Sequence, residues 1–275
     1  VLAKMGFTTP RTKAGVIGRT LRDRVVLRVR GFNFQPRAAV TLAPEEIEEL
    51  DTVNAARAGL SMLDPMRSNM FASLYVRRCL EVGEPSRVVG ALSMEAAQLS
   101  FQGAPTYDRV QRLLQAARMI ADEHQCGAAS DLNFVKGAVA FFNGHFSEAL
   151  KRIEATQKSE QRGTLGDEVE GPYREMFELL SLYHMGRFNE LRARKREHLQ
   201  HARERANLCA ETTVRAGPQV ATWLIEDKPA KAGSDLQNAV RRWPEGSFIG
   251  QRCWAFLGAR AADMYLGDGN YAWAR

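Results

Sequence analysis

A short phrase that ends one helix and starts the next recurs along the chain at nearly constant spacing. The turn residues of its four copies are Gly144, Gly186, Asp227 and Gly267, which lie 42, 41 and 40 residues apart. In each copy the turn follows a helical run and precedes another. Such a period is typical of stacked helical hairpins, because one hairpin cannot bury its apolar face alone. The sequence therefore predicts a helical scaffold.

Helix boundaries follow from the apolar spacing, from Pro at helix starts and from Gly after helix ends. Predicted helices cover residues 11–30, 45–62, 65–82, 85–102, 106–125, 130–143, 146–161, 172–185, 188–206, 208–225, 229–242 and 248–266. Three glycines and three acids predict a mobile loop at residues 162–171. Only residues 39–42 alternate like a strand. The prediction is all-α, with a basic N-terminal helix and linker over residues 1–43 and an α-solenoid over residues 44–275.

Composition places the chain among folded cytoplasmic proteins. It has 275 residues, of which 45% are hydrophobic and 25% charged, with no long apolar run and no signal peptide. The four cysteines have no paired spacing, so we expect buried reduced thiols and neither a zinc cage nor a disulfide framework. They are Cys79, Cys126, Cys209 and Cys253.

Positive charge is concentrated at the N-terminus. Residues 1–37 carry nine Lys or Arg and one acid, a net charge of +8, whereas the other 238 residues carry 29 bases and 31 acids, a net charge of −2. The predicted 11–30 helix has an apolar stripe of Val16, Ile17, Leu21, Val25 and Val29. Its candidate docking residues are Arg19, Arg22, Arg24, Arg28 and Arg30.

Three interpretations of this helix are open. It caps the solenoid with its arginines in solvent, or it docks onto a protein partner or an upstream domain of the same chain. Alternatively, residues 11–37 bind an anionic membrane or nucleic acid. In the first two interpretations another part of the protein covers the apolar stripe.

Aromatic residues and Met recur on the first helix of successive hairpins, which normally faces the concave surface of a helical repeat protein. An apolar groove of this kind can bind a partner helix, although the same residues can simply pack between hairpins. The candidate groove residues are Phe134, Tyr173, Met176, Tyr183, His184 and Trp254.

Motifs for catalysis or metal binding are absent from the sequence. There is no phosphate-binding loop, no G-x-S-x-G turn and no H-E-x-x-H pair. His198 and His201 have a spacing that metal sites use, but Arg194, Lys195 and Arg196 surround them, which predicts a solvated basic face. We therefore predict no catalytic residue, no metal and no cofactor.

Two resemblances narrow these expectations. Gly137 before the turn residue Gly144, with Ala149 after it, resembles the tetratricopeptide repeat, which implies a right-handed solenoid of helical hairpins. The family period of about 34 residues is shorter than the 40–42 residues of this chain.

Four stretches are similar to the repeat region that follows the kinase domain in large bacterial eukaryotic-like serine/threonine protein kinases. They are Leu27–Arg37, Gly59–Asp64, Gly83–Ala97 and Met264–Gly269. The kinase motifs themselves are missing. The resemblance thus implies a non-catalytic signalling segment of a longer protein that carries the kinase. We expect an interaction scaffold, with a ligand- or peptide-sensing domain or a nucleic-acid or membrane adaptor as alternatives.

Overall fold

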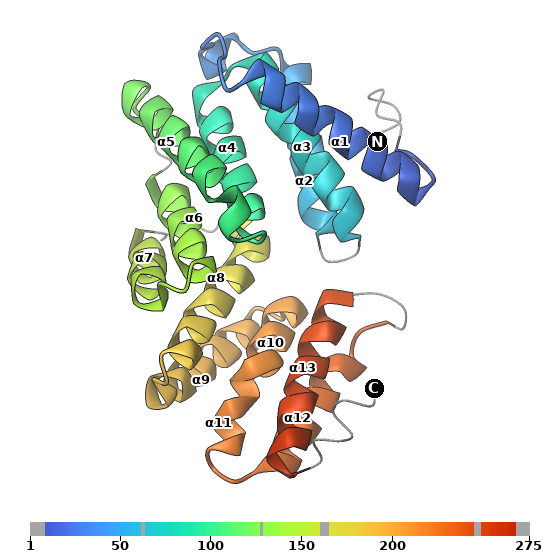
Figure 1. The fold of residues 1–275 in the computed structure, drawn as a ribbon, viewed down its shortest axis with the longest axis vertical. Helices are drawn as coiled ribbons and strands as arrows, with labels where there is room; N and C mark the ends of the chain where they lie inside the picture. Colours follow the sequence, from blue (N-terminus) through green and yellow to red (C-terminus); the bar gives the residue numbers. More distant parts are fainter. Residues whose placement is uncertain (1–8, 62–63, 127–128, 160–164, 245–248, 268–275) are drawn as a thin grey trace. The chain divides into compact units, whose positions relative to one another are not determined.

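The computed structural model describes residues 9–61, 64–126, 129–159, 165–244 and 249–267 (Figure 1). These ranges hold thirteen α-helices and three short 3-10 helices, and they contain no strand. The all-α prediction is confirmed. The segment with strand-like alternation forms the 3-10 helix η1 (Ala39–Thr41).

The chain divides into two compact units, unit 1 (Val1–Asn143) and unit 2 (Gly144–Arg275). In unit 1, α1 and α2 each pack on α3, while α4 packs on α3, α5 and α6. Its α-helices are α1 (Lys13–Arg30), α2 (Pro44–Leu60), α3 (Pro65–Val82), α4 (Pro85–Ser100), α5 (Tyr107–Glu123) and α6 (Ala129–Phe142); η2 (Ala104–Thr106) is a 3-10 helix.

Helix starts in unit 1 follow the predicted chemistry. Pro65 and Pro85 open α3 and α4, where a missing backbone N–H costs nothing. The residue before each Pro caps the helix: the Asp64 carboxylate accepts from the Arg67 backbone N–H, and the Glu84 carboxylate accepts from the N–H groups of the next turn. These caps explain why the predicted starts match the observed ones.

One continuous apolar cluster forms the core of unit 1. It contains residues from all six α-helices, including Leu27 of α1, Phe71 of α3, Leu92 of α4 and Leu113 of α5. Leu42, from the linker before α2, belongs to the same cluster. The predicted N-terminal segment of residues 1–43 therefore shares a core with the helices that follow it.

Unit 2 is built from helix pairs that pack on one another. The main pairs are α7 with α8, α9 with α10, and α12 with α13. Two small apolar clusters form its core, one around Leu182 and Leu191 and the other around Val220 and Leu236. Its elements are α7 (Phe146–Ser159), α8 (Leu165–His184), α9 (Phe188–Glu204), α10 (Leu208–Arg215), the 3-10 helix η3 (Gly217–Val220), α11 (Ala221–Leu224), α12 (Pro229–Arg241) and α13 (Ile249–Tyr265).

All four turn residues of the repeated phrase have a left-handed backbone. The φ angles are 79° at Gly144, 70° at Gly186, 55° at Asp227 and 85° at Gly267. Asp is one of the few residues other than Gly that visit this region readily. The four turns that were predicted to be equivalent therefore all have a left-handed turn residue.

Two predictions in unit 2 are wrong. The loop expected at residues 162–171 is helical from Leu165 onward, and α8 continues through Pro172. Three acids, at positions 167, 168 and 170, fall near the start of this helix, where the positive end of the dipole favours negative charge. Residues 162–164 lie outside the described residues.

The second wrong prediction is a continuous helix over residues 208–225. The helix breaks after Ala216, where Gly217 has a φ of 71°. The Trp254 indole lies only 2.5 Å from the point where a Cβ on Gly217 would stand. A side chain at this position would collide with α13, so Gly allows both the break and the close approach.

Candidate protein-interaction surface

Helix α1 has two apolar faces. Its inner face packs on α3 and buries Val16, Asp23 and Leu27. The helix starts at Thr12, whose hydroxyl accepts from the Gly15 N–H at 3.2 Å, and it ends at Gly31, which has a positive φ. With both ends fixed and one face in the core, the opposite face points into solvent.

We call this opposite face the α1 ridge; it consists of Ile17, Leu21, Val25 and Val29. These side chains are 48%, 57%, 59% and 85% exposed. Each follows the last by four residues, which places them in one row along the helix. Val16, predicted in the same stripe, lies on the buried face instead. No described part of the chain covers the ridge, so capping by the solenoid does not account for it.

The arginines of α1 divide into two groups. Arg24 and Arg30 point toward α3: Arg24 Nη2 donates to Asn69 Oδ1 at 3.1 Å, and Arg30 Nη2 donates to the Leu80 carbonyl at 3.2 Å. Arg19 is half-buried. Arg22 and Arg28 are exposed beside the ridge, and Arg22 Nη2 also lies 3.1 Å from the buried Asp23 carboxylate. Of the five predicted docking arginines, these two are therefore the ones that lie in solvent beside the ridge.

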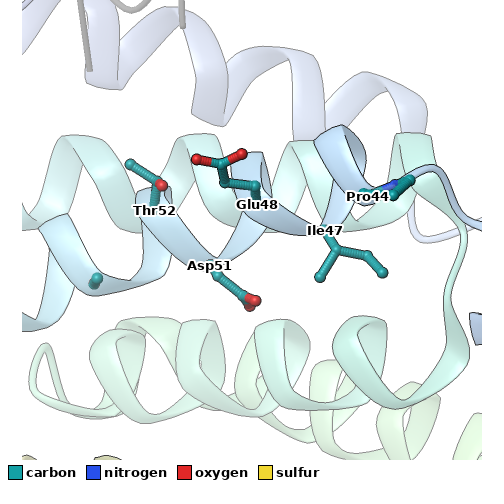
Figure 2. A pocket seen from close by; sticks show the side chains of 6 residues that line it. Pro44, Ile47, Glu48, Asp51 and Thr52 are labelled. Atoms are coloured by element: carbon teal, nitrogen blue, oxygen red, sulfur yellow. The ribbon is translucent and has the colours of Figure 1, made fainter. Parts of the chain in front are cut away.

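The outer side of α2 carries a second surface, which we call the α2 groove. It is a shallow hollow of about 590 Å³, and every residue that lines it comes from α2 (Figure 2). The lining is mainly apolar, with two carboxylates, and Asp51 pairs with Arg87 of α4. The lining residues are Pro44, Ile47, Glu48, Asp51, Thr52 and Ala55.

The predicted aromatic groove residues lie in several places. In unit 1, the half-buried Phe134 packs against the core. In unit 2, Tyr173 and Met176 are half-buried on α8, and Trp254 packs in the C-terminal core. Tyr183 and His184 meet at 5.3 Å between ring centroids.

The prediction missed the partners of Tyr183 and His184. Phe146 stacks on His184 at 4.6 Å, and Phe188 meets Tyr183 at 6.2 Å. A signal was present in the repeated phrase, because each Phe stands two residues after a turn Gly. Two of the four copies of the repeat thus place an aromatic side chain at the start of the second helix.

The solvated basic face predicted for residues 194–205 is wrong for two of its members. His198 is 6% exposed, and its Nε2 lies 2.9 Å from Glu178 Oε2 of α8. Burial alone would lower the pKa of His198, but the hydrogen bond and the charges of Glu178 and Glu175 outweigh it and raise the pKa. Burial raises the pKa of Glu175. The Glu178 carboxylate, 20 positions earlier in the chain, therefore compensates for the burial of His198.

Lys195 is the second buried member. Its ammonium donates to the Gln219 carbonyl at 3.0 Å and to the Thr222 hydroxyl at 3.3 Å, and it lies 5.7 Å from the centre of the Trp223 ring. Burial lowers the pKa of Lys195 to about 8. Nearby, Arg215 pairs with Asp235 at 2.5 Å and with Glu211 at 2.9 Å. Buried or partly buried charges thus occur on α8, α9, α10 and α12.

The prediction that the cysteine thiols are buried holds for Cys79 alone. Cys79 is buried and burial raises the pKa of its thiol to about 12, whereas Cys126 and Cys209 are half-buried and Cys253 is exposed on α13. All four thiols are free. The exposed position of Cys253 agrees with its neighbour Leu257, which is also exposed.

Comparisons with known proteins add no family. No protein-family model, curated protein or solved structure matches the chain. Within the described ranges, no helix is long and apolar enough to cross a membrane, and no three His, Cys, Asp or Glu side chains are grouped as metal ligands. Among the surfaces described above, the α1 ridge is the strongest candidate for a functional site.

Proposed function

We propose that this chain is a non-catalytic helical-repeat scaffold that binds a protein partner through the α1 ridge. The observation that carries the proposal is the two-sided burial pattern of α1. A helix that is apolar on two opposite sides is normally covered on both. In this chain α3 covers one side, and an aliphatic row remains open on the other.

The composition of the ridge favours a protein over a membrane. Helices that lie on membranes usually place Trp, Phe or Leu on the apolar face and many cations on the other. The ridge has one Leu and three β-branched residues and no aromatic side chain, and α3 covers the opposite side of the helix. A row of aliphatic residues four apart is the kind of surface that packs into the groove of another helix.

The wider context belongs to the same proposal. We propose a tetratricopeptide-like, right-handed solenoid with a period of 40–42 residues, supported by four left-handed turns at that spacing. We also propose that the segment serves a bacterial serine/threonine kinase, on the similarity of four stretches of sequence. In this role the chain positions a partner, and the kinase domain performs the chemistry.

Site-specific photo-crosslinking tests the proposal. A photoreactive amino acid replaces Val25 of the ridge in the full-length protein within its host cell, and the matched control replaces Val40, which is 94% exposed on η1. Protein adducts at position 25, and few at position 40, are expected. Adducts with lipid or nucleic acid alone would overturn the proposal. ATP-dependent phosphorylation by the isolated chain would contradict its non-catalytic part.

A further inference from the structure

The α1 ridge and the α2 groove have complementary chemistry. The ridge is a convex aliphatic row beside the exposed cations Arg22 and Arg28. The groove is a mainly apolar hollow with the exposed carboxylate of Glu48, while its second carboxylate, Asp51, is already paired with Arg87 of α4. Opposite charges beside matching apolar surfaces are what a specific interface requires.

The two surfaces also match in length. The ridge runs from Ile17 to Val29, which spans about 18 Å of helix, and the groove runs from Pro44 to Ala55, which spans about 16 Å. One helix can therefore lie along the other over the whole row. The exposed Glu48 then stands within reach of a cation on the ridge.

Within one copy the two surfaces point away from each other. Both α1 and α2 pack on α3, and each surface lies on the side of its helix opposite the buried residues. The buried residues of α2 are Leu50 and Val53, whereas Glu48, Thr52 and Ala55 of the groove lie on the other face. Ile47, at the edge of the groove, packs against the core, and Asp51 pairs with Arg87 of α4. A ridge can thus meet a groove only in another molecule.

We infer that the partner of the α1 ridge is a second copy of this chain, which receives the ridge in its α2 groove. This inference rests on the proposed function and adds the identity of the partner. Contact between two ridges is disfavoured, because α1 carries six basic residues and one acid, and that acid is the buried Asp23. The acidic groove removes this repulsion.

The contact is heterologous, since two different surfaces meet. After one ridge and one groove have joined, the complex still has a free groove at one end and a free ridge at the other. Such contacts extend into rings or open chains of molecules. The chain therefore self-assembles head to tail, which is a means of clustering any domain attached to it.

Complementing variants test this inference. Leu21→Glu puts an acid on the ridge, and Ala55→Arg puts a large cation in the groove; both residues are exposed, so the core is left intact. Sedimentation velocity at about 100 μM measures the assembly of each protein. We expect species larger than one chain for the unmodified protein, and at least about tenfold weaker association for each variant.

The decisive sample is an equimolar mixture of the two variants. The intact ridge of Ala55→Arg then meets the intact groove of Leu21→Glu, and species larger than one chain are expected from the mixture, although each variant alone associates weakly. Val40→Glu is the matched control, because it adds the same charge at an exposed aliphatic residue outside both surfaces. Its assembly should equal that of the unmodified protein. Circular dichroism checks that every variant folds.

A second pair keeps the test informative if Leu21→Glu misfolds. Arg28→Glu and Glu48→Arg should each weaken assembly, and the double variant should restore it. A monomeric unmodified protein, or a mixture of the two complementing variants that remains monomeric, would overturn the inference. If position 25 still crosslinks to a different protein in cells, the proposed function survives and only the identity of the partner is wrong.

Discussion

Unit 1 and unit 2 differ in how many charged side chains they bury. Among the described residues, unit 1 buries Asp23, Glu84 and Glu95, and unit 2 buries Arg174, Glu178, Lys195, His198, Glu211 and Arg215. Unit 1 has one continuous apolar cluster that joins all six of its helices. Unit 2 has two small clusters and a larger set of buried charges, among them Glu178, Lys195, His198 and Arg215. One unit is thus stabilised mainly by apolar packing and the other depends on paired charges.

The difference has physical consequences. Apolar burial stabilises through the area removed from water, and it is insensitive to pH. A buried ion pair contributes little net stability, because desolvation opposes the attraction, yet removing one partner is costly. We therefore expect unit 1 to respond most to changes of volume and unit 2 to changes of charge.

The largest effect should come from a cavity in unit 1. Phe71 is 1% exposed in the centre of the cluster, so Phe71→Ala should lower the free energy of unfolding by about 4 kcal/mol. Hydrogen exchange in α3 and α4 measures this change. Phe101→Ala, at a residue that is 61% exposed, is the matched control and should change little. Equal effects of the two variants would contradict the apolar description of unit 1.

A change of charge should have a similar but smaller effect in unit 2. Glu178→Ala removes the carboxylate that is hydrogen-bonded to the buried His198 and should destabilise unit 2 by about 3 kcal/mol. All four tryptophans belong to unit 2, so urea unfolding followed by their fluorescence reports on it. Glu154→Ala removes an acid that lies 3.6 Å from Arg194 in a more exposed pair and should cost less than about 1 kcal/mol.

Two glycines of unit 1 should respond in opposite ways to replacement by Ala, because only one of them has a positive φ and a close backbone neighbour. Gly83 has a φ of 81°, and a Cβ there would lie 2.1 Å from the Gln35 carbonyl oxygen, so Gly83→Ala should destabilise unit 1 by about 2 kcal/mol. Gly90, inside α4, has nothing within 4 Å of a Cβ. Gly90→Ala should stabilise the unit by about 0.5–1 kcal/mol, because Ala suits a helix interior better. Thermal unfolding of both variants checks the opposite signs.

Local signals were sufficient to predict most helices and all four turns. A proline at a helix start or a glycine after its end acts within a few residues, so Pro65, Gly83 and Gly186 mark boundaries in the sequence itself. The two faces of α1 were not predictable, because the period of the helix does not say which apolar row meets α3. The break at Gly217 depends on Trp254, which is 37 residues away.

Buried charges were the other failure of prediction. Lys195 and His198 stand in a strongly basic stretch, which is typical of a solvated helix face. Their burial depends on Glu178, the Gln219 carbonyl and Thr222, which come from other elements. Distant partners of this kind leave no periodic signal in the sequence.

The pH dependence of unfolding should differ in sign between the units. In the folded protein the pKa of His198 lies above its ordinary value. This shift stabilises unit 2 at pH values below the ordinary pKa of His, and the stabilisation is lost as the pH rises through the folded pKa. Lys195 acts in the opposite sense: its pKa falls from 10.5 to about 8, so the folded state binds fewer protons in that window and stability rises with pH. Unit 2 should therefore be least stable near pH 8.

Unit 1 should lose stability over the alkaline pH range in which unit 2 gains it. The Cys79 pKa rises from 9.0 to about 12, so the unfolded thiol ionises first and stability falls above pH 9. Each change in the free energy of unfolding should be about 1 kcal/mol across one pH unit.

Urea unfolding from pH 6 to pH 10, with tryptophan fluorescence for unit 2 and hydrogen exchange in α3 for unit 1, measures the pH dependence of both units. Lys195→Met should abolish the rise in unit 2 and Cys79→Ala the fall in unit 1. Parallel profiles in the two units would mean that the contrast between an apolar and a charged interior does not govern their stability.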